Sequence, residues 1–189
     1  MTGQFRVLAL CGSLRAASIN AALLRAAARL APSPMAVEVF TGLGRLPLFN
    51  PDDELDPPSA VRALRDAVAA ADALLIASPE YAHGVTGTIK NALDWLVSFE
   101  PFVHEPVAVW NASPRAHHAD DALRETLKTM SAEIIEPASV SIALLGAQLG
   151  EDGMVASPSV SGTIRSALQA LHDAVEQGAS ERGPSFRLG

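Results

Sequence analysis

Residues 10–20, LCGSLRAASIN, place two serines and one arginine directly after an apolar run. Hydroxyl groups and a planar guanidinium are donors that bind phosphate oxygens well. A helical pattern begins near Asn20, and the start of a helix presents free backbone N–H groups and the positive end of its dipole. Ser13, Arg15 and Ser18 therefore predict a site for a dianionic phosphomonoester.

Other readings of this stretch stay open when it is considered by itself. Ser18 is equally suited to cap the helix, with Arg15 as a solvated surface residue. Ser13 is also in the right place for a hydrolase nucleophile, although no GxSxG turn surrounds it. Neither GxGxxG nor GxxxxGK[ST] is present, which disfavours a dinucleotide fingerprint and a nucleoside triphosphatase.

A second loop, SPEYAHGVTG at 78–87, offers different chemistry. Its proline and glycines force an irregular, exposed backbone, and Pro79 and Tyr81 can flank a planar ring while free N–H groups face its edge. We expect Glu80 to accept structural hydrogen bonds, and His83 on its own is as well explained by a surface role. On the helix that follows, Lys90 and Asp94 have the spacing of a local ion pair.

Alternating elements must position these loops. The predicted strands are 5–10, 35–40, 73–77, 107–110 and 140–145. The predicted helices are 20–30, 60–71 (capped by Ser59), 88–97, 118–130 and 160–177. This order predicts an α/β doubly wound five-stranded parallel sheet with helices on both faces. Ligands of such sheets bind at the carboxyl ends of the strands, so we expect the ligand site at loops 11–19, 78–87 and 111–118.

Composition limits the classes of partner. The 189 residues carry a net charge of −7 without a basic stripe, so we expect neither nucleic acid nor a membrane surface as a partner. No run approaches the roughly 20 apolar residues of a membrane span. Cys11 is the single cysteine, which excludes an intrachain disulfide. We expect one domain over 1–178, a polar tail at 179–189, and a cytoplasmic location.

Three blocks together resemble the NADPH-dependent FMN reductase family: GSLRAASIN at 12–20, LPLFNPDDE at 46–54 and SPEYAHGVTGTIKNALDW at 78–95. The resemblance implies a flavodoxin-like fold that binds FMN, with the phosphate in the first loop and the isoalloxazine ring against the second. The implied cofactor-binding residues are Ser13, Arg15, Ser18, Asn20, Pro79, Glu80, Tyr81, Ala82, His83, Gly84 and, in the third loop, Ser113.

The sequence departs from the family pattern near the ring. Ala82 stands where the family often has asparagine, and Thr86 stands where it often has proline. The third loop, NASPRAHHADD, lacks the glycines common in relatives. These departures imply one side-chain hydrogen bond fewer near the flavin and an altered ring contact.

The implied reaction is hydride transfer from NADPH or NADH to flavin N5, followed by electron delivery to a quinone, flavin, azo compound or metal oxyanion. The cofactor carries this chemistry, so we name no catalytic side chain. The family implies a homodimer or homotetramer, with the 46–54 loop as a wall or interface element. The alternative is a non-enzymatic flavin protein, an electron carrier or redox sensor without a pyridine nucleotide site.

A histidine-rich segment could suggest a metal. His117, His118, Asp120 and Asp121 follow one another closely. Acidic residues are favoured at the start of a helix by the helix dipole, and a solvated helix start explains the cluster without a metal. We therefore expect no metal site.

Overall fold

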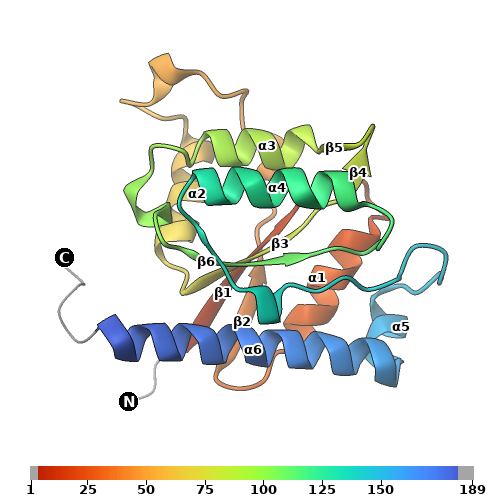
Figure 1. The fold of residues 1–189 in the computed structure, drawn as a ribbon. Helices are drawn as coiled ribbons and strands as arrows, with labels where there is room; N and C mark the ends of the chain where they lie inside the picture. The colour runs from red at the N-terminus through yellow and green to blue at the C-terminus, as the bar shows by residue number, and fades with distance from the viewer. Residues whose placement is uncertain (1–3, 183–189) are drawn as a thin grey trace.

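A computed structural model describes residues 4–182 and contains a five-stranded parallel sheet (Figure 1). The sheet order is β2-β1-β3-β6-β7. The strands are β1 (Phe5–Cys11), β2 (Met35–Val39), β3 (Ala73–Ala77), β6 (Pro106–Trp110) and β7 (Glu133–Ile134). This is the order of a flavodoxin-like sheet, and it confirms the predicted fold class.

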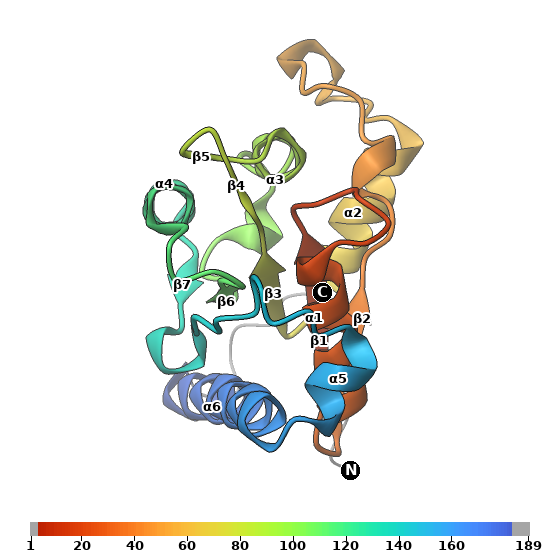
Figure 2. The ribbon, with the colours of Figure 1, turned by 90° about the vertical axis from the view of Figure 1, so that its right-hand side faces the viewer.

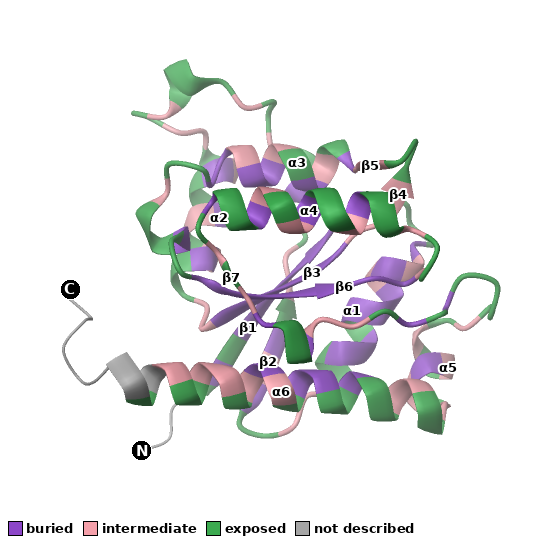
Figure 3. Ribbon diagram, viewed as in Figure 1, coloured by how far each residue is buried: buried purple, intermediate pink, exposed green. Residues whose placement is uncertain are grey.

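Helices cover both faces of the sheet (Figure 2). One face carries α1 (Ile19–Leu30) and α6 (Pro158–Arg182), with the short α5 (Glu151–Ala156) beside α1. The other carries α2 (Ser59–Ala69), α3 (Gly87–Asp94) and α4 (His117–Thr129). Figure 3 shows the central strands almost wholly buried and the helices exposed on their outer sides.

The continuous apolar strands supply both layers of core. In β1, Val7 and Ala9 pack against the α1 and α6 side, while Leu8 and Leu10 pack against the α2, α3 and α4 side. Alternate residues of a strand point to opposite faces, so a strand buried on both sides must be apolar throughout. This packing fixes the carboxyl ends of β1, β3 and β6 side by side.

The predicted strand over 140–145 was wrong. The fifth strand is Glu133–Ile134, and a 3-10 turn at Glu136–Ala138 follows it. Parallel pairing resumes only as a single bridge between Asn111 and Ser141. Pro137 has no N–H to donate to the ladder and fits the turn, which explains why the fifth strand is split in two.

Smaller differences concern element ends. Ser59 is the first residue of α2 rather than its cap, and the capping position is Pro58. The predicted loop 78–87 contains a hairpin of β4 (Glu80–Tyr81) and β5 (Gly84–Val85). Helix α6 continues to Arg182, into the expected tail, and 183–189 lie outside the described residues. Among the described residues, no helix combines the length and apolar character of a membrane span.

The segment between β2 and α2 carries an arm, defined here as residues 46–56, which extends away from the sheet (Figure 2, orange). The indole N–H of Trp95 donates to the Pro47 carbonyl at 2.9 Å, and the Phe49 ring packs edge-on against Trp95. Trp95 is fully buried. Leu48 and Leu55 point into solvent, 85% and 100% exposed.

Candidate functional site

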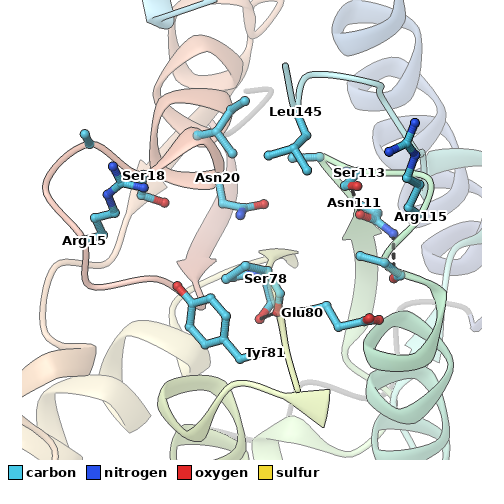
Figure 4. Close-up of a pocket in the computed structure, with 15 residues that line it drawn as sticks. Arg15, Ser18, Asn20, Ser78, Glu80, Tyr81, Asn111, Ser113, Arg115 and Leu145 are labelled. Carbon is cyan, nitrogen blue, oxygen red and sulfur yellow. Dashed lines mark hydrogen bonds between the residues drawn. The ribbon is translucent and has the colours of Figure 1, made fainter. Parts of the chain in front are cut away.

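A cavity of about 430 Å³ opens at the carboxyl edge of the sheet, beside β1 and β3, where the strand order reverses. This is the predicted place for a ligand in a doubly wound sheet. Three loops and one side chain from a fourth segment surround it (Figure 4). The lining residues are Arg15, Ala17, Ser18, Ile19, Asn20, Ser78, Pro79, Glu80, Tyr81, Asn111, Ala112, Ser113, Arg115, Ala116 and Leu145.

The first loop leaves β1 through a tight junction. A Cβ on Gly12 would lie 2.6 Å from the Ser78 Cβ and 2.9 Å from Ile89 Cγ1, so only glycine lets the loop pass so close to β3 and α3. Ser18 then caps α1, because its Oγ accepts from the backbone N–H of Ala21 at 3.2 Å. The start of α1 is thereby held against the cavity.

Two groups of the first loop face the cavity without a partner. Among the described residues, the Arg15 guanidinium forms no hydrogen bond or ion pair. Asn20 is 3% exposed, and its Oδ1 has no hydrogen-bond donor. A buried acceptor left unpaired costs free energy, so these groups are suited to a ligand that brings an anion and a donor.

The second loop is fixed to α4 by a carboxylate. Glu80 Oε2 accepts from the backbone N–H of Ala119 at 2.9 Å, which satisfies one of the free donors at the start of that helix. This confirms the structural role expected for Glu80. The neighbouring Tyr81 ring is 57% exposed at the cavity. Lys90 and Asp94 form the expected ion pair on α3.

The third loop is closed by the side chain of Asn111. Its Oδ1 accepts from Ser113 N at 2.8 Å, and its Nδ2 donates to the Ala116 carbonyl at 3.0 Å. Leu145 reaches the same cavity, since the backbone N–H groups of Leu144 and Leu145 both bond to the Ala112 carbonyl. An asparagine therefore gives this loop its shape.

The hairpin tip lies outside the cavity lining. Ala82 and His83 form its turn with φ of 51° and 59°, and Gly84 follows. The His83 ring lies 4.4 Å from that of His118, which lies 4.1 Å from that of His117. The planes of neighbouring rings are tilted by 31° and 37°, so the three exposed imidazoles form a row of tilted rings from the hairpin to α4. Within residues 4–182, no histidine, cysteine or carboxylate cluster is suited to a metal.

Seven of the predicted site residues line the cavity together. They are Arg15, Ser18, Asn20, Pro79, Glu80, Tyr81 and Ser113. Ser13 does not line it but bonds within the loop, where its Oγ accepts from Arg15 N at 3.4 Å. Asn111 and Leu145 were not predicted. A polar residue directly after strand 107–110 was the available signal for Asn111, whereas Leu145 was assigned to a strand.

Comparisons with known proteins agree with this geometry. A model of the NADPH-dependent FMN reductase family matches residues 5–144. An NAD(P)H-dependent FMN reductase of Pseudomonas aeruginosa PAO1 is 34% identical over 177 residues, covering 90% of this chain and 95% of that protein. A quinone reductase of Escherichia coli K12 is 33% identical over 117 residues, covering 60% of this chain and 62% of that protein.

A solved structure extends the likeness to three dimensions. It is FerB of Paracoccus denitrificans, described as a flavoenzyme NAD(P)H:(acceptor) oxidoreductase. The two structures share a TM-score of 0.75 at 26% sequence identity, over 92% of this chain and 98% of that chain.

Proposed function

The chain belongs to the NADPH-dependent FMN reductase family, and on that premise we propose that its cavity binds FMN and that a quinone is its electron acceptor. The protein is an NAD(P)H-dependent flavin oxidoreductase, with FMN as cofactor and a pyridine nucleotide as co-substrate. What remains to be assigned is which residues hold the cofactor, which acceptor is used and how many copies assemble.

The first loop fits the phosphate and ribityl end of FMN. The single observation that carries this assignment is the buried, unpartnered Asn20 Oδ1 beside the unpaired Arg15. FMN brings both missing partners: a dianionic phosphate for the guanidinium and ribityl hydroxyl donors for the amide oxygen. Ser18 and the start of α1 add donors to the same end.

The second and third loops fit the ring. Pro79 and Tyr81 offer flat apolar contact on one side, and Ala112 and Leu145 offer apolar contact across the cavity. Glu80 is held by Ala119 N, so it braces the loop. A cavity of about 430 Å³ lies within the usual range for a cofactor or drug-sized ligand.

FMN, when bound, would supply the redox chemistry: hydride acceptance from the pyridine nucleotide and two-electron reduction of the acceptor. The side chains of this chain bind, orient and exclude water. A planar quinone suits a site whose open edge is formed by the exposed Tyr81 and Leu145 side chains. The name of the E. coli relative, quinone reductase, supports the same acceptor class.

The test begins with the visible spectrum of protein loaded with FMN, before and after anaerobic NADPH. We expect a bound-flavin spectrum that bleaches with NADPH and recovers on addition of a benzoquinone. Flavin that binds but stays oxidised would contradict the reductase assignment. If the oxidised-flavin spectrum recovers with an azo dye or chromate but with no quinone, the assignment of a quinone as acceptor is contradicted.

We further propose that the protein is a homodimer or homotetramer assembled through the arm, and that it is located in the cytoplasm. Leu48 and Leu55 are large apolar side chains held in solvent by an anchored segment, and burial against a second copy would remove both from water. The cytoplasm holds an NAD(P)H pool and keeps a free thiol such as Cys11 reduced.

Light scattering of the purified protein tests the assembly. The double change Leu48→Ser and Leu55→Ser is expected to shift the mass toward the monomer, whereas Val103→Ser, an exposed apolar residue outside the arm, leaves it unchanged. A wild-type monomer at micromolar concentration would contradict the proposal.

A further inference from the structure

A second cavity borders the cofactor cavity. Its volume is about 410 Å³, and it shares Ser113, Arg115 and Leu145 with the first. The rest of its lining is Pro114, Ala143 and Gly146, so Arg115 and Ser113 are the polar side chains in an otherwise apolar or backbone wall. A ligand that occupies the first cavity can therefore extend past Arg115 into the second.

Arg115 is a free cation in an acidic protein. Among the described residues its guanidinium has no hydrogen bond and no carboxylate within ion-pair distance. Many other cations of the chain are paired with acids. The paired cations are Arg25, Arg29, Arg62, Arg65, Lys90 and Arg124. An unpaired arginine at the junction of two cavities is thus available to an anionic ligand.

The phosphate of FMN does not account for Arg115. Figure 4 shows Arg15 and Arg115 on opposite sides of the cofactor cavity. FMN has one phosphate, and Arg15, the Ser18 hydroxyl and the start of α1 are the donors proposed above for it. With the ring between the second and third loops, no anionic group of FMN is left for Arg115.

The backbone of Arg115 is held while its side chain stays free. The carbonyl of Arg115 lies 3.2 Å from Nδ1 of His117, whose ring stacks on His118. Asn111 closes the loop on both sides of this residue through Ser113 and Ala116. Such a fixed backbone reduces the entropy lost when the guanidinium engages a ligand.

We propose that Arg115 and the second cavity bind a phosphate of the pyridine nucleotide, either its pyrophosphate or the 2′-phosphate that distinguishes NADPH from NADH. The apolar walls of the second cavity contact the adenosine half, while the nicotinamide ring lies in the first cavity. The inference rests on the proposed placement of FMN. It makes Arg115 a residue that determines affinity for the nucleotide and, in the 2′-phosphate case, the choice between nucleotides.

The test measures binding without turnover. NADP⁺ and NAD⁺ are titrated into FMN-loaded protein, and dissociation constants are taken from the change in flavin absorbance. Arg115→Gln is expected to weaken NADP⁺ binding by about tenfold or more, because a charge-assisted contact is lost. If the affinity for NAD⁺ falls by the same factor, Arg115 binds the pyrophosphate. If the affinity for NAD⁺ is unchanged, Arg115 binds the 2′-phosphate. In steady state the KM for NADPH rises while kcat stays near the wild-type value.

Two matched variants make the outcome decisive. Arg45→Gln removes another exposed arginine whose side chain has no partner within residues 4–182; it lies outside both cavities, and its loss should leave NADP⁺ affinity unchanged. Arg15→Gln should weaken FMN binding and leave riboflavin binding unchanged. Unchanged NADP⁺ affinity in Arg115→Gln, or a loss of FMN affinity there, overturns the inference. If Arg15→Gln leaves FMN affinity unchanged, the proposed placement of FMN fails instead.

Discussion

The two edges of the sheet each bury a polar oxygen that has no partner among the described residues. At the carboxyl edge it is Oδ1 of Asn20, and at the amino edge it is Oε1 of Glu105, which directly precedes β6. Asn20 lines a cavity that also exposes Arg15. Glu105 has another carboxylate, Asp72, close enough to act on it electrostatically.

The surroundings decide what an unpartnered group does. Beside an open cavity and a free cation, the Asn20 oxygen is available to a ligand. Beside a second acid, the Glu105 carboxyl keeps a proton more readily: burial and the charge of Asp72 raise its pKa to about 8. The same structural irregularity therefore lies in the proposed binding site at one edge and produces a stability cost at the other.

The largest predicted effect is the pH dependence of stability that arises from Glu105. Its pKa rises from 4.5 to about 8 on folding, so the folded protein holds a proton that the unfolded chain releases. The stabilisation that this proton gives the folded state is fully present below pH 4.5, falls as pH rises and is lost above about pH 8. The size is on the order of 5 kcal/mol.

Urea unfolding at a series of pH values measures this effect. Glu105→Gln stays neutral throughout, so its free energy of unfolding should exceed that of the wild type increasingly from pH 5 to 9. Glu38→Gln, an exposed acid on β2, is the control and should run parallel to the wild type. A constant offset between Glu105→Gln and the wild type at every pH would contradict the prediction.

A second prediction concerns the packing under the first loop. Gly12→Ala would bring a methyl group within 2.6 Å of the Ser78 Cβ and 2.9 Å of Ile89 Cγ1, so β1, β3 and α3 must move apart. We expect a loss of about 2–3 kcal/mol in unfolding free energy, together with weaker FMN binding. Gly87→Ala is the matched control, since its Cβ would meet nothing within 4 Å. Comparable destabilisation by both variants would show that the close approach is unimportant.

The features that the sequence predicted well depend on local chemistry. The buried strands are recognisable in the sequence as unbroken apolar runs. The loop after β1 combines hydroxyls, a cation and a helix start within a few residues. Arg15, Ser18 and Asn20 accordingly line the cavity together. Their contact with FMN stays a prediction.

The features that were missed depend on partners far away in the chain. Leu145 reaches the cavity because its segment bonds to Ala112, and the break of the fifth strand at Pro137 freed that segment from the sheet. The contact between the His83 and His118 rings, which joins the hairpin to α4, was not predicted. No spacing within the hairpin or the third loop alone encodes such a contact.

A third prediction tests the carboxyl edge directly. Asn20→Ala removes the unpartnered oxygen, so the stability of the protein without flavin should change by less than about 1 kcal/mol. FMN and riboflavin should both bind about tenfold more weakly, because an acceptor needs a donor and the ribityl hydroxyls are common to both. Calorimetric titration of the two flavins gives the answer. A loss for FMN alone would assign Asn20 to the phosphate.

The smallest predicted effect separates the two roles of Ser18, which caps α1 and faces the cavity. Ser18→Ala loses the bond to Ala21 N and should cost about 1 kcal/mol of unfolding free energy, whereas Ser18→Gly costs only a few tenths because glycine is tolerated at the cap. If the hydroxyl also binds the phosphate, both variants lose FMN affinity by a similar factor despite their different stabilities. Denaturation without flavin and FMN titration, performed on both variants, separate the roles. FMN affinity that follows stability from one variant to the other would mean that Ser18 acts only through the helix.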